Sequence, residues 1–273
     1  MVDILLVKPN SGLPAGGLSA IEPPFWATMI ANDYISQGRR VAILDAEVDD
    51  LSVYETVAKI TMLRPEEVII VVMGNNPSVS STPKMADAQI LAKALLRAGL
   101  SVALTGLHPM ALRERTMLDT GCGVVTWHPR PDSSPAYDLL DLSKYRAHNW
   151  HCLDRLEERS PYAVIATSFG CPFTCDYCNI HVLYNAKLVY RPIQLILEDL
   201  ATVAKQNVRN IKFWDECFTV NKMRVKRLCE AIIGRHWDLN IWAYARPDTV
   251  DADMLSLMKQ AGINWLAYGL DDK

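Results

Sequence analysis

Short apolar runs separated by helical patterns dominate the first half of the chain. The runs lie at residues 4–7, 41–44, 68–72, 102–104 and 124–125, and the helical patterns between them lie at 27–34, 51–63 and 91–98. A strand that is apolar at every position is buried on both faces, as in parallel sheets covered by helices. We therefore predict an α/β fold whose N-terminal domain, residues 1–126, is a doubly wound, Rossmann-like parallel sheet.

A second alternating series follows a proline-rich stretch at residues 127–161, which we predict to be a linker. Four further strands are predicted at residues 162–168, 210–214, 239–245 and 264–269. Helical patterns separate them, one starting after Pro192 and the others at 225–232 and 254–261. Strands and helices in this order predict a partial (β/α) barrel, or a small open sheet, over residues 162–273.

Composition narrows the class of protein. The net charge is -3 with no long run of one sign, so charge gives no sign of nucleic-acid binding. No apolar run approaches the roughly 18 residues that cross a bilayer, and the N-terminus lacks a signal-peptide pattern. We therefore expect a cytoplasmic protein without a membrane span. In that reducing compartment, the seven cysteines are expected to be thiols or metal ligands.

Three of these cysteines stand close together in "GCPFTCDYC", directly after the strand predicted at 162–168. Cys171, Cys175 and Cys178 could take His181 as a fourth ligand and form a zinc site. Three thiolates alone suit a [4Fe–4S] cluster that leaves one iron open for a substrate or cofactor. We favour the cluster because the loop lacks a second cysteine pair and catalytic groups are common at such strand ends. Zinc remains the alternative.

The spacing CxxxCxxC, with an aromatic residue before the last cysteine, resembles the signature of radical S-adenosylmethionine (SAM) enzymes. In that family the open iron holds the amino and carboxylate groups of SAM. An electron from a donor such as flavodoxin or ferredoxin then cleaves SAM to an adenosyl radical, which removes a hydrogen atom from the substrate. The resemblance implies that Cys171, Cys175 and Cys178 bind the cluster and that Tyr177 lies against the adenine. No catalytic residue is assigned beyond the cofactor ligands.

Further matches to this family stand at the ends of the next three predicted strands. "FWDECF" resembles the segment that holds the SAM amino group, with Asp215 and Glu216 as its acidic members. "YARPD" implies that Arg246 meets the SAM carboxylate, which suits a guanidinium. "YGLDD" implies that Asp271 bonds the ribose hydroxyls.

The first domain resembles the cobalamin-binding domain of B12-dependent radical SAM enzymes. The matching features are a helix start with two prolines, Pro23 and Pro24, and a "GLHP" turn. The D-x-H-x-x-G motif, whose histidine binds cobalt in other B12 proteins, is absent, so we expect no protein imidazole below the cobalt. The residues implied to contact cobalamin are Asn10, Ser78, Ser80, Ser81, Gly106 and His108.

The combined resemblance covers nearly the whole chain and implies a cobalamin-dependent C-methyltransferase. Such an enzyme would methylate an unactivated carbon of a small-molecule or natural-product substrate, with one SAM as methyl source and a second as radical source. A cyclisation or rearrangement with the same cofactors is an alternative, as is a non-catalytic zinc- or cobalamin-binding module. The family's core has six βα units, so we expect this chain to be truncated at its C-terminus.

The remaining thiols and a histidine pair have simpler interpretations. We predict that Cys122, Cys217 and Cys229 are core or loop thiols. The stretch "HNWHC", residues 148–152, lacks a full ligand set, so we predict that it packs with Trp150 buried and binds no metal.

Overall fold

The structure, a computed structural model, describes residues 2–10, 19–74 and 84–269 and divides into two units. The first unit comprises Met1–Gly17, Pro24–Leu140 and Thr174–Asn185, and the second comprises Leu18–Pro23, Asp141–Phe173 and Ala186–Lys273. The main division falls inside the stretch predicted as a linker. Some predicted contact residues lie outside the described residues: Ser78, Ser80, Ser81 and Asp271.

The apolar runs of the first half form one parallel sheet, in the order β2-β1-β3-β4-β5. Its strands are β1 (Ile4–Lys8), β2 (Val41–Asp45), β3 (Glu67–Val71), β4 (Val102–Thr105) and β5 (Gly123–Val124). The strand order reverses at β1, so the switch point of the fold lies between β1 and β3. The predicted doubly wound sheet is confirmed.

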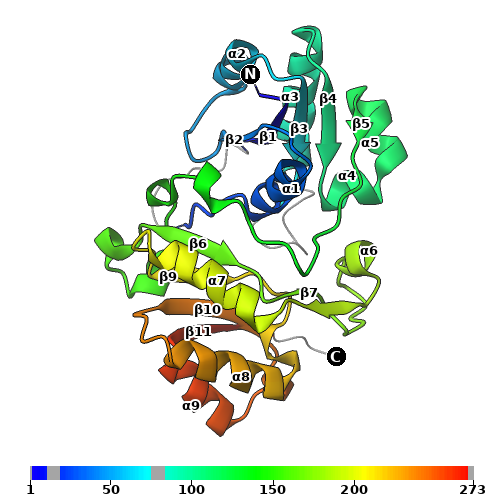
Figure 1. Cartoon of the computed structure of the whole chain (residues 1–273). Coiled ribbons are helices and arrows are strands. Elements are labelled where there is room, and N and C mark those ends of the chain that lie inside the picture. The colour runs from blue at the N-terminus through cyan, green and yellow to red at the C-terminus, as the bar shows by residue number, and fades with distance from the viewer. Residues whose placement is uncertain (1, 11–18, 75–83, 270–273) are drawn as a thin grey trace. The chain divides into compact units, whose positions relative to one another are not determined.

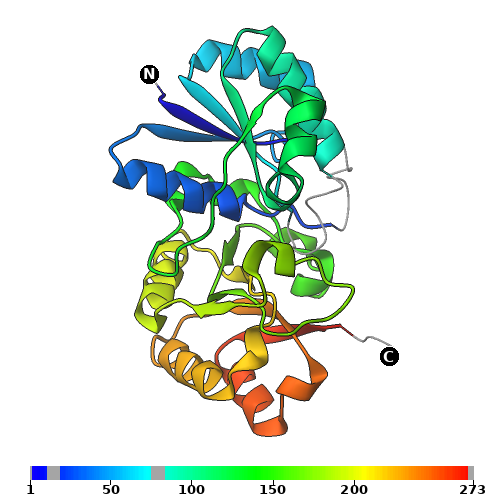
Figure 2. The ribbon, with the colours of Figure 1, turned by 90° about the vertical axis from the view of Figure 1, so that its right-hand side faces the viewer.

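Helices cover both faces of this sheet. On one side lies α1 (Phe25–Ser36), and on the other lie α2 (Val53–Leu63) and α3 (Met85–Arg97) (Figure 2). Successive strand residues point to opposite faces. Leu5, Val7 and Ile70 therefore share a buried cluster with residues of α2 and α3. This two-sided burial explains the continuous apolar runs within the strands.

Two short helices follow β4 where the sequence predicted a turn and no further helix. The "GLHP" segment starts α4 (Leu107–Ala111), and α5 (Arg113–Thr120) follows at once. The sequence of α5, "RERTMLDT", is mostly polar and carries no apolar stripe, so periodicity could not reveal it.

The second unit contains a four-stranded parallel sheet in the order β11-β10-β9-β6. Its strands are β6 (Tyr162–Ile165), β9 (Asn210–Phe213), β10 (Asn240–Ala245) and β11 (Ile263–Tyr268). The helices α7 (Ile193–Ala204), α8 (Lys222–Ile233) and α9 (Ala252–Gln260) lie along one side of it (Figure 1). Neighbouring strands follow chain order, as in a (β/α) barrel, so the predicted partial barrel is confirmed.

The strand predicted at residues 162–168 is split in two. β6 ends at Ile165, and β7 (Ser168–Gly170) pairs antiparallel with β8 (Leu188–Tyr190) outside the parallel sheet. The prediction was wrong here because contacts distant in sequence turn the chain after β6. The cysteine loop and α6 (His181–Tyr184) lie between β7 and β8.

Residues 137–158 form only short 3-10 helices: η1 (Tyr137–Leu139), η2 (Leu142–Lys144), η3 (Asn149–Cys152) and η4 (Leu156–Glu158). Burial lowers the pKa of His151 to about 4, and its Nε2 atom lies 2.9 Å from the Asn240 carbonyl oxygen. Trp150 was expected to be buried, but it is 37% exposed. Its ring instead covers the edge of the core, 5.5 Å from Trp242 and 5.7 Å from Trp265 between ring centroids.

Candidate active site

The cysteine loop leaves β7 at Gly170, whose positive φ of 85° suits glycine. Cys171, Cys175 and Cys178 are partly exposed and form no disulfide. The Cys178 N–H donates to the Cys175 carbonyl at 3.0 Å, so a tight turn holds the CxxC pair. Within the described residues no three His, Cys, Asp or Glu side chains form an assembled metal-ligand group. The loop therefore offers three accessible thiols to an incoming metal cluster.

Tyr177 and His181, the two aromatic residues closest in sequence to the last cysteine, have different surroundings. Tyr177 is 68% exposed, which leaves its ring accessible to a ligand. His181, the fourth ligand of the zinc alternative, lies in α6. Both of its ring nitrogens are buried and lack a hydrogen-bond partner in the part of the chain that the structure describes. The Cys3His group is thus not assembled either.

Asp215 follows β9 and is 1% exposed. Its carboxylate accepts hydrogen bonds from the Thr167 N–H at 2.8 Å and the Thr167 hydroxyl at 2.6 Å. The Ser168 hydroxyl donates a third. Burial raises the pKa of Asp215, and these hydrogen bonds offset part of that rise. The predicted contact with SAM would therefore compete with partners that both carboxylate oxygens already have.

Glu216, the next residue, has the opposite surroundings. The residue is only partly buried, but its Oε1 atom is fully buried and has no hydrogen-bond partner among the described residues. Burial raises the pKa of Glu216 to about 8, opposed by the charge of Lys212 and reinforced by Asp215. A buried carboxylate oxygen without a partner is an energetic cost that an N–H donor from a ligand would relieve.

Arg246 follows β10 and reaches the cysteine loop. Its guanidinium lies over the ring of Phe173, 4.1 Å from the ring centroid, and Phe173 is part of "CPFTC". The same guanidinium donates to both carboxylate oxygens of Asp248, at 3.0 and 2.9 Å. Its side chain is 37% exposed, so a ligand carboxylate has access to it. The structure therefore brings Arg246 and one side of the cysteine loop together.

A buried ion-pair group lies at the strand ends of the first unit and was not predicted from the sequence. Lys8 Nζ lies 3.1 Å from Asp45 and 2.7 Å from Glu47, and Lys84 Nζ lies 2.8 Å from Glu47. Burial opposes ionisation of Glu47, but both lysines outweigh it and lower its pKa to about 2. Lys8 and Asp45 each follow an apolar run and are register partners across β1 and β2. The signal available in the sequence was the charged residue directly after each of these apolar runs.

The described residues predicted to contact cobalamin have local explanations. Asn10 donates to Asp50 at 3.2 Å and to the Leu51 carbonyl at 3.3 Å. Gly106 has a φ of 121°, and a Cβ there would lie 2.1 Å from the Val72 carbonyl oxygen, so packing alone requires glycine. His108 is partly buried, which lowers its pKa. Their contact with cobalamin stays a prediction.

Cys122, Cys217 and Cys229, predicted to be core or loop thiols, are buried, and so is Cys152. Cys217 directly follows Glu216 in the chain, and its Sγ atom lies 3.8 Å from the Thr219 hydroxyl. Burial raises the pKa of its thiol. It is therefore a poor thiolate ligand.

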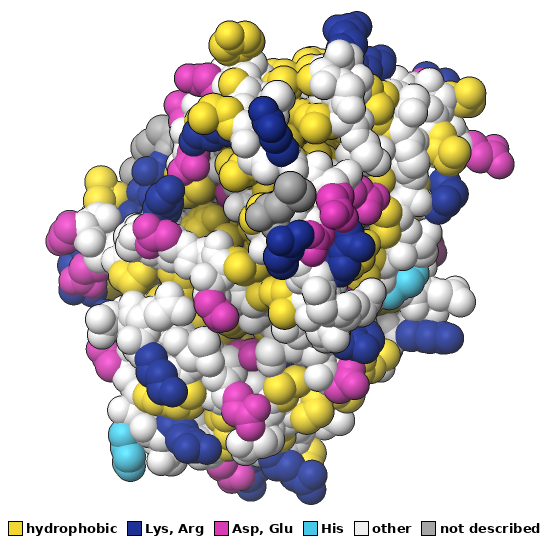
Figure 3. All heavy atoms as spheres, turned by 45° about the horizontal axis from the view of Figure 1, so that its top comes forward, with side chains coloured by type: hydrophobic (Ala, Val, Ile, Leu, Met, Phe, Trp, Pro, Cys, Tyr) yellow, Lys and Arg dark blue, Asp and Glu magenta, His cyan; other side chains and the backbone are white. Residues whose placement is uncertain are grey.

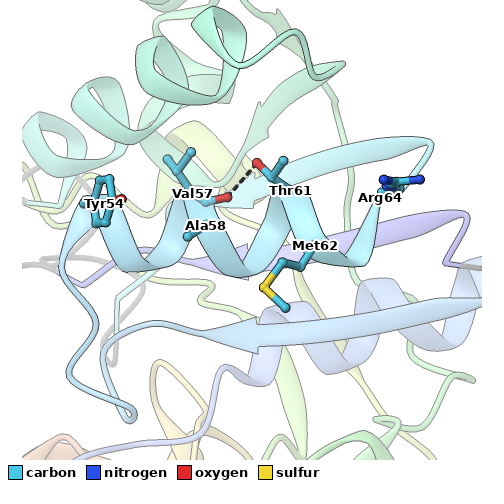
Figure 4. Close-up of a pocket in the computed structure, with 6 residues that line it drawn as sticks. All are labelled: Tyr54, Val57, Ala58, Thr61, Met62 and Arg64. Carbon is cyan, nitrogen blue, oxygen red and sulfur yellow. Dashed lines mark hydrogen bonds between the residues drawn. The ribbon is translucent and has the colours of Figure 1, made fainter.

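A hollow on the outer side of α2 is unrelated to this chemistry (Figure 4). Its lining is Tyr54, Val57, Ala58, Thr61, Met62 and Arg64. It contains no carboxylate, thiol or imidazole, and its one hydrogen bond between lining residues joins the Thr61 hydroxyl to the Val57 carbonyl.

On the face drawn in Figure 3, positive and negative side chains are interspersed. Among the described residues, no helix has the length and hydropathy to span a bilayer.

Comparison with known proteins gives no matching family model. Among curated proteins, the chain is 27% identical to an uncharacterised methyltransferase of Pyrococcus horikoshii over 138 residues, which is 50% of this chain and 28% of the relative. It is 24% identical to the anaerobic magnesium-protoporphyrin IX monomethyl ester cyclase of Synechocystis over 92% of this chain and 57% of the relative. The chain thus spans less than two thirds of these relatives.

Solved structures show the same fold. The radical SAM methyltransferase TsrM of Kitasatospora setae, with cobalamin and a [4Fe–4S] cluster bound, matches 99% of this chain with a TM-score of 0.75 at 16% identity. This chain covers 61% of TsrM. The cobalamin-dependent radical SAM enzyme OxsB, with aqua-cobalamin and SAM bound, matches 99% with a TM-score of 0.65 at 13% identity, and 44% of OxsB is covered. The predicted resemblance to cobalamin-dependent radical SAM enzymes is confirmed at the level of the fold.

Proposed function

We propose that this chain carries the cobalamin-binding and radical SAM parts of an enzyme that methylates an unactivated carbon of a small molecule. The observation that carries the proposal is the arrangement around the cysteine loop. Three accessible thiols share a loop that Arg246 contacts through Phe173, and Glu216 presents a buried oxygen without a hydrogen-bond partner among the described residues at the neighbouring strand end. These groups suit the cluster, the carboxylate of SAM and the amino group of SAM, respectively.

Each residue has a defined task in this proposal. Cys171, Cys175 and Cys178 hold three irons, Glu216 accepts a hydrogen bond from the SAM amino group, and Arg246 pairs with the SAM carboxylate. Before SAM binds, Asp248 keeps the Arg246 guanidinium oriented through two hydrogen bonds. When bound, the cluster and an external electron donor such as flavodoxin or ferredoxin supply the reducing electron, SAM the radical and methyl groups, and cobalamin the methyl carrier.

We propose a small-molecule substrate because a structural neighbour binds one. TsrM has been solved with a tryptophan substrate and a SAM analogue, and its fold matches 98% of this chain. The proposal places cobalamin at the strand ends of the first unit, where Asn10 and His108 lie. Gly106, Ser78, Ser80 and Ser81 complete the proposed set, and Asp271 is proposed for the ribose hydroxyls.

A cyclase is the second candidate because the two sequence relatives that span almost all of this chain carry that name. The Synechocystis protein covers 92% of this chain, and a Rubrivivax gelatinosus protein of the same name covers 98% at 21% identity. Both candidates share the cofactors and differ in the fate of the SAM methyl group.

The test is anaerobic incubation of the reconstituted protein with a reductant, hydroxocobalamin, candidate substrates and SAM labelled in its methyl group. The methyltransferase proposal predicts 5′-deoxyadenosine, S-adenosylhomocysteine and label in the product. A cyclase would form 5′-deoxyadenosine and leave the product unlabelled. If reductant and SAM give no 5′-deoxyadenosine at all, both candidates fail and the zinc module gains support.

A further inference from the structure

Asp215 joins β9 to the segment that leads into the cysteine loop. Its side chain is buried and takes all three of its described hydrogen bonds from two adjacent residues, Thr167 and Ser168. A buried carboxylate is tolerated only where donors compensate for its lost hydration. Three donors, one of them a backbone N–H, satisfy that need here. The contact is therefore a tight link between two chain segments 48 residues apart.

The link lies where the backbone ladder stops. β6 and β9 pair in parallel up to Ile165 and Phe213, and the Trp214 N–H then donates to the Ile165 carbonyl at 2.9 Å. Beyond that point, the Asp215 carboxylate accepts the Thr167 N–H in place of a backbone carbonyl. The side chain thus extends the pairing by one step while the main chain turns away into β7.

A second clamp holds the same point. The Thr167 carbonyl accepts from the Arg191 N–H at 3.0 Å and from the Arg224 guanidinium at 3.1 Å. Arg224 also stacks over the ring of Tyr190, 4.7 Å from its centroid, and Tyr190 is the register partner of Ser168. The N–H, hydroxyl and carbonyl of Thr167 are therefore all engaged. Three residues further on, β7 ends at Gly170 and Cys171 begins the loop.

We propose that Asp215 is a positioning residue for the cysteine loop and not a direct contact of SAM. Through Thr167 and Ser168 it fixes β7 and so the backbone from which Cys171 projects. The hydrogen bonds of Asp215 to Thr167 and Ser168 are present without any cofactor. Only their effect on cluster binding rests on the proposed function. Asp215→Asn should preserve much of it, because the amide oxygen can accept the Thr167 N–H while both hydroxyls reverse to accept from the amide nitrogen.

The first experiment is hydrogen exchange on the full chain without iron. Asp215→Ala should speed exchange in peptides covering residues 166–173 at least about tenfold, Thr167→Val less, and Asp215→Asn least. Val203→Ala, which removes buried apolar volume from α7, is the control for general loss of stability. Exchange in 166–173 that matches this control would overturn the proposal. Should Asp215→Ala fail to fold, Thr167→Val and Asp215→Asn give the same comparison.

The second experiment separates positioning from SAM contact. After anaerobic reconstitution, Asp215→Ala should bind less iron and sulfide and alter the EPR spectrum of the reduced cluster. SAM should then bind the remaining cluster-containing fraction within about twofold of the wild-type Kd. An intact cluster with a Kd raised tenfold would instead make Asp215 a SAM contact and contradict the proposal. If wild-type protein takes up no iron, the proposed function fails, while the exchange experiment still decides the role of Asp215.

Discussion

Two adjacent acids at the end of β9 have opposite surroundings although the sequence suggested one shared task. Asp215 has three donors, whereas the buried oxygen of Glu216 has no partner among the described residues. Sequence resemblance could identify the segment but not divide the tasks within it. The division depends on Thr167 and Ser168, which are distant in sequence and come beside β9 only through folding.

Glu216→Gln should weaken SAM binding while leaving the iron content unchanged. The amide keeps the shape but loses the negative charge that makes the carboxylate a strong acceptor for the SAM amino group, so we expect the Kd for SAM to rise about tenfold, or roughly 1.4 kcal/mol. Equilibrium binding to reconstituted protein at a pH above 8 measures this. Glu230→Gln, the same change at an exposed position of α8, is the matched control and should change the Kd much less; equal effects of the two substitutions would refute the assignment.

The raised pKa of Glu216 also predicts a pH-dependent stability. The ordinary pKa is 4.5 and the folded-state pKa is about 8, so between these values the folded protein keeps a proton that the unfolded chain releases. The free energy of unfolding should therefore fall as pH rises from 4.5 to 8 and level off above 8. Urea unfolding of wild type and Glu216→Gln across this range should show the fall only in wild type.

At the scale of the elements, Gly106 is the position where the backbone allows no side chain. Its φ of 121° and the 2.1 Å approach of a Cβ to the Val72 carbonyl both forbid alanine. We expect Gly106→Ala to lower the free energy of unfolding by more than about 2 kcal/mol in urea denaturation. Gly123→Ala is the control, since a Cβ there meets nothing within 4 Å, and it should stay within about 0.5 kcal/mol of wild type.

The ion-pair group of Lys8, Asp45, Glu47 and Lys84 predicts acid sensitivity in the first unit. The pKa of Glu47 is lowered from 4.5 to about 2, so its contribution is present above pH 4.5 and is lost as pH falls through about 2. At pH 7 that contribution is roughly 3 kcal/mol. Glu47→Gln should cost a similar amount at pH 7 and little at pH 2, as circular dichroism during urea unfolding would detect. An equal cost at both pH values would contradict this.

Most of the regular elements could be predicted because their apolar patterns are local. The strands of both parallel sheets and the helices α1, α2, α3, α7, α8 and α9 follow from such patterns. β7 and β8 could not be predicted, because strands of three residues carry no usable alternation and the contacts of Thr167 beside β7 come from Asp215 and Arg224, which are distant in sequence. Trp150 was predicted to be buried because residues 148–152 were expected to pack and not to bind a metal, but its ring lies partly exposed beside Trp242.

At the scale of the whole molecule, the fold of the chain matches the folds of cobalamin-dependent radical SAM enzymes. The sequence led to this conclusion from three cysteines and the βα order, because the spacing of thiols on one loop is itself local. The residues that contact cobalamin could not be predicted in this way. They depend on which loops meet at the switch point of the first sheet, and much of that set lies outside the described residues.

The central claim is that the loop of Cys171, Cys175 and Cys178 holds a [4Fe–4S] cluster. Iron, acid-labile sulfide and zinc should be measured on the anaerobically reconstituted chain, together with Cys175→Ala and, as a buried-thiol control, Cys229→Ala. We predict about four irons and four sulfides in wild type and Cys229→Ala, and a loss of both in Cys175→Ala. Zinc bound in place of iron, or iron retained after Cys175→Ala, would contradict the claim.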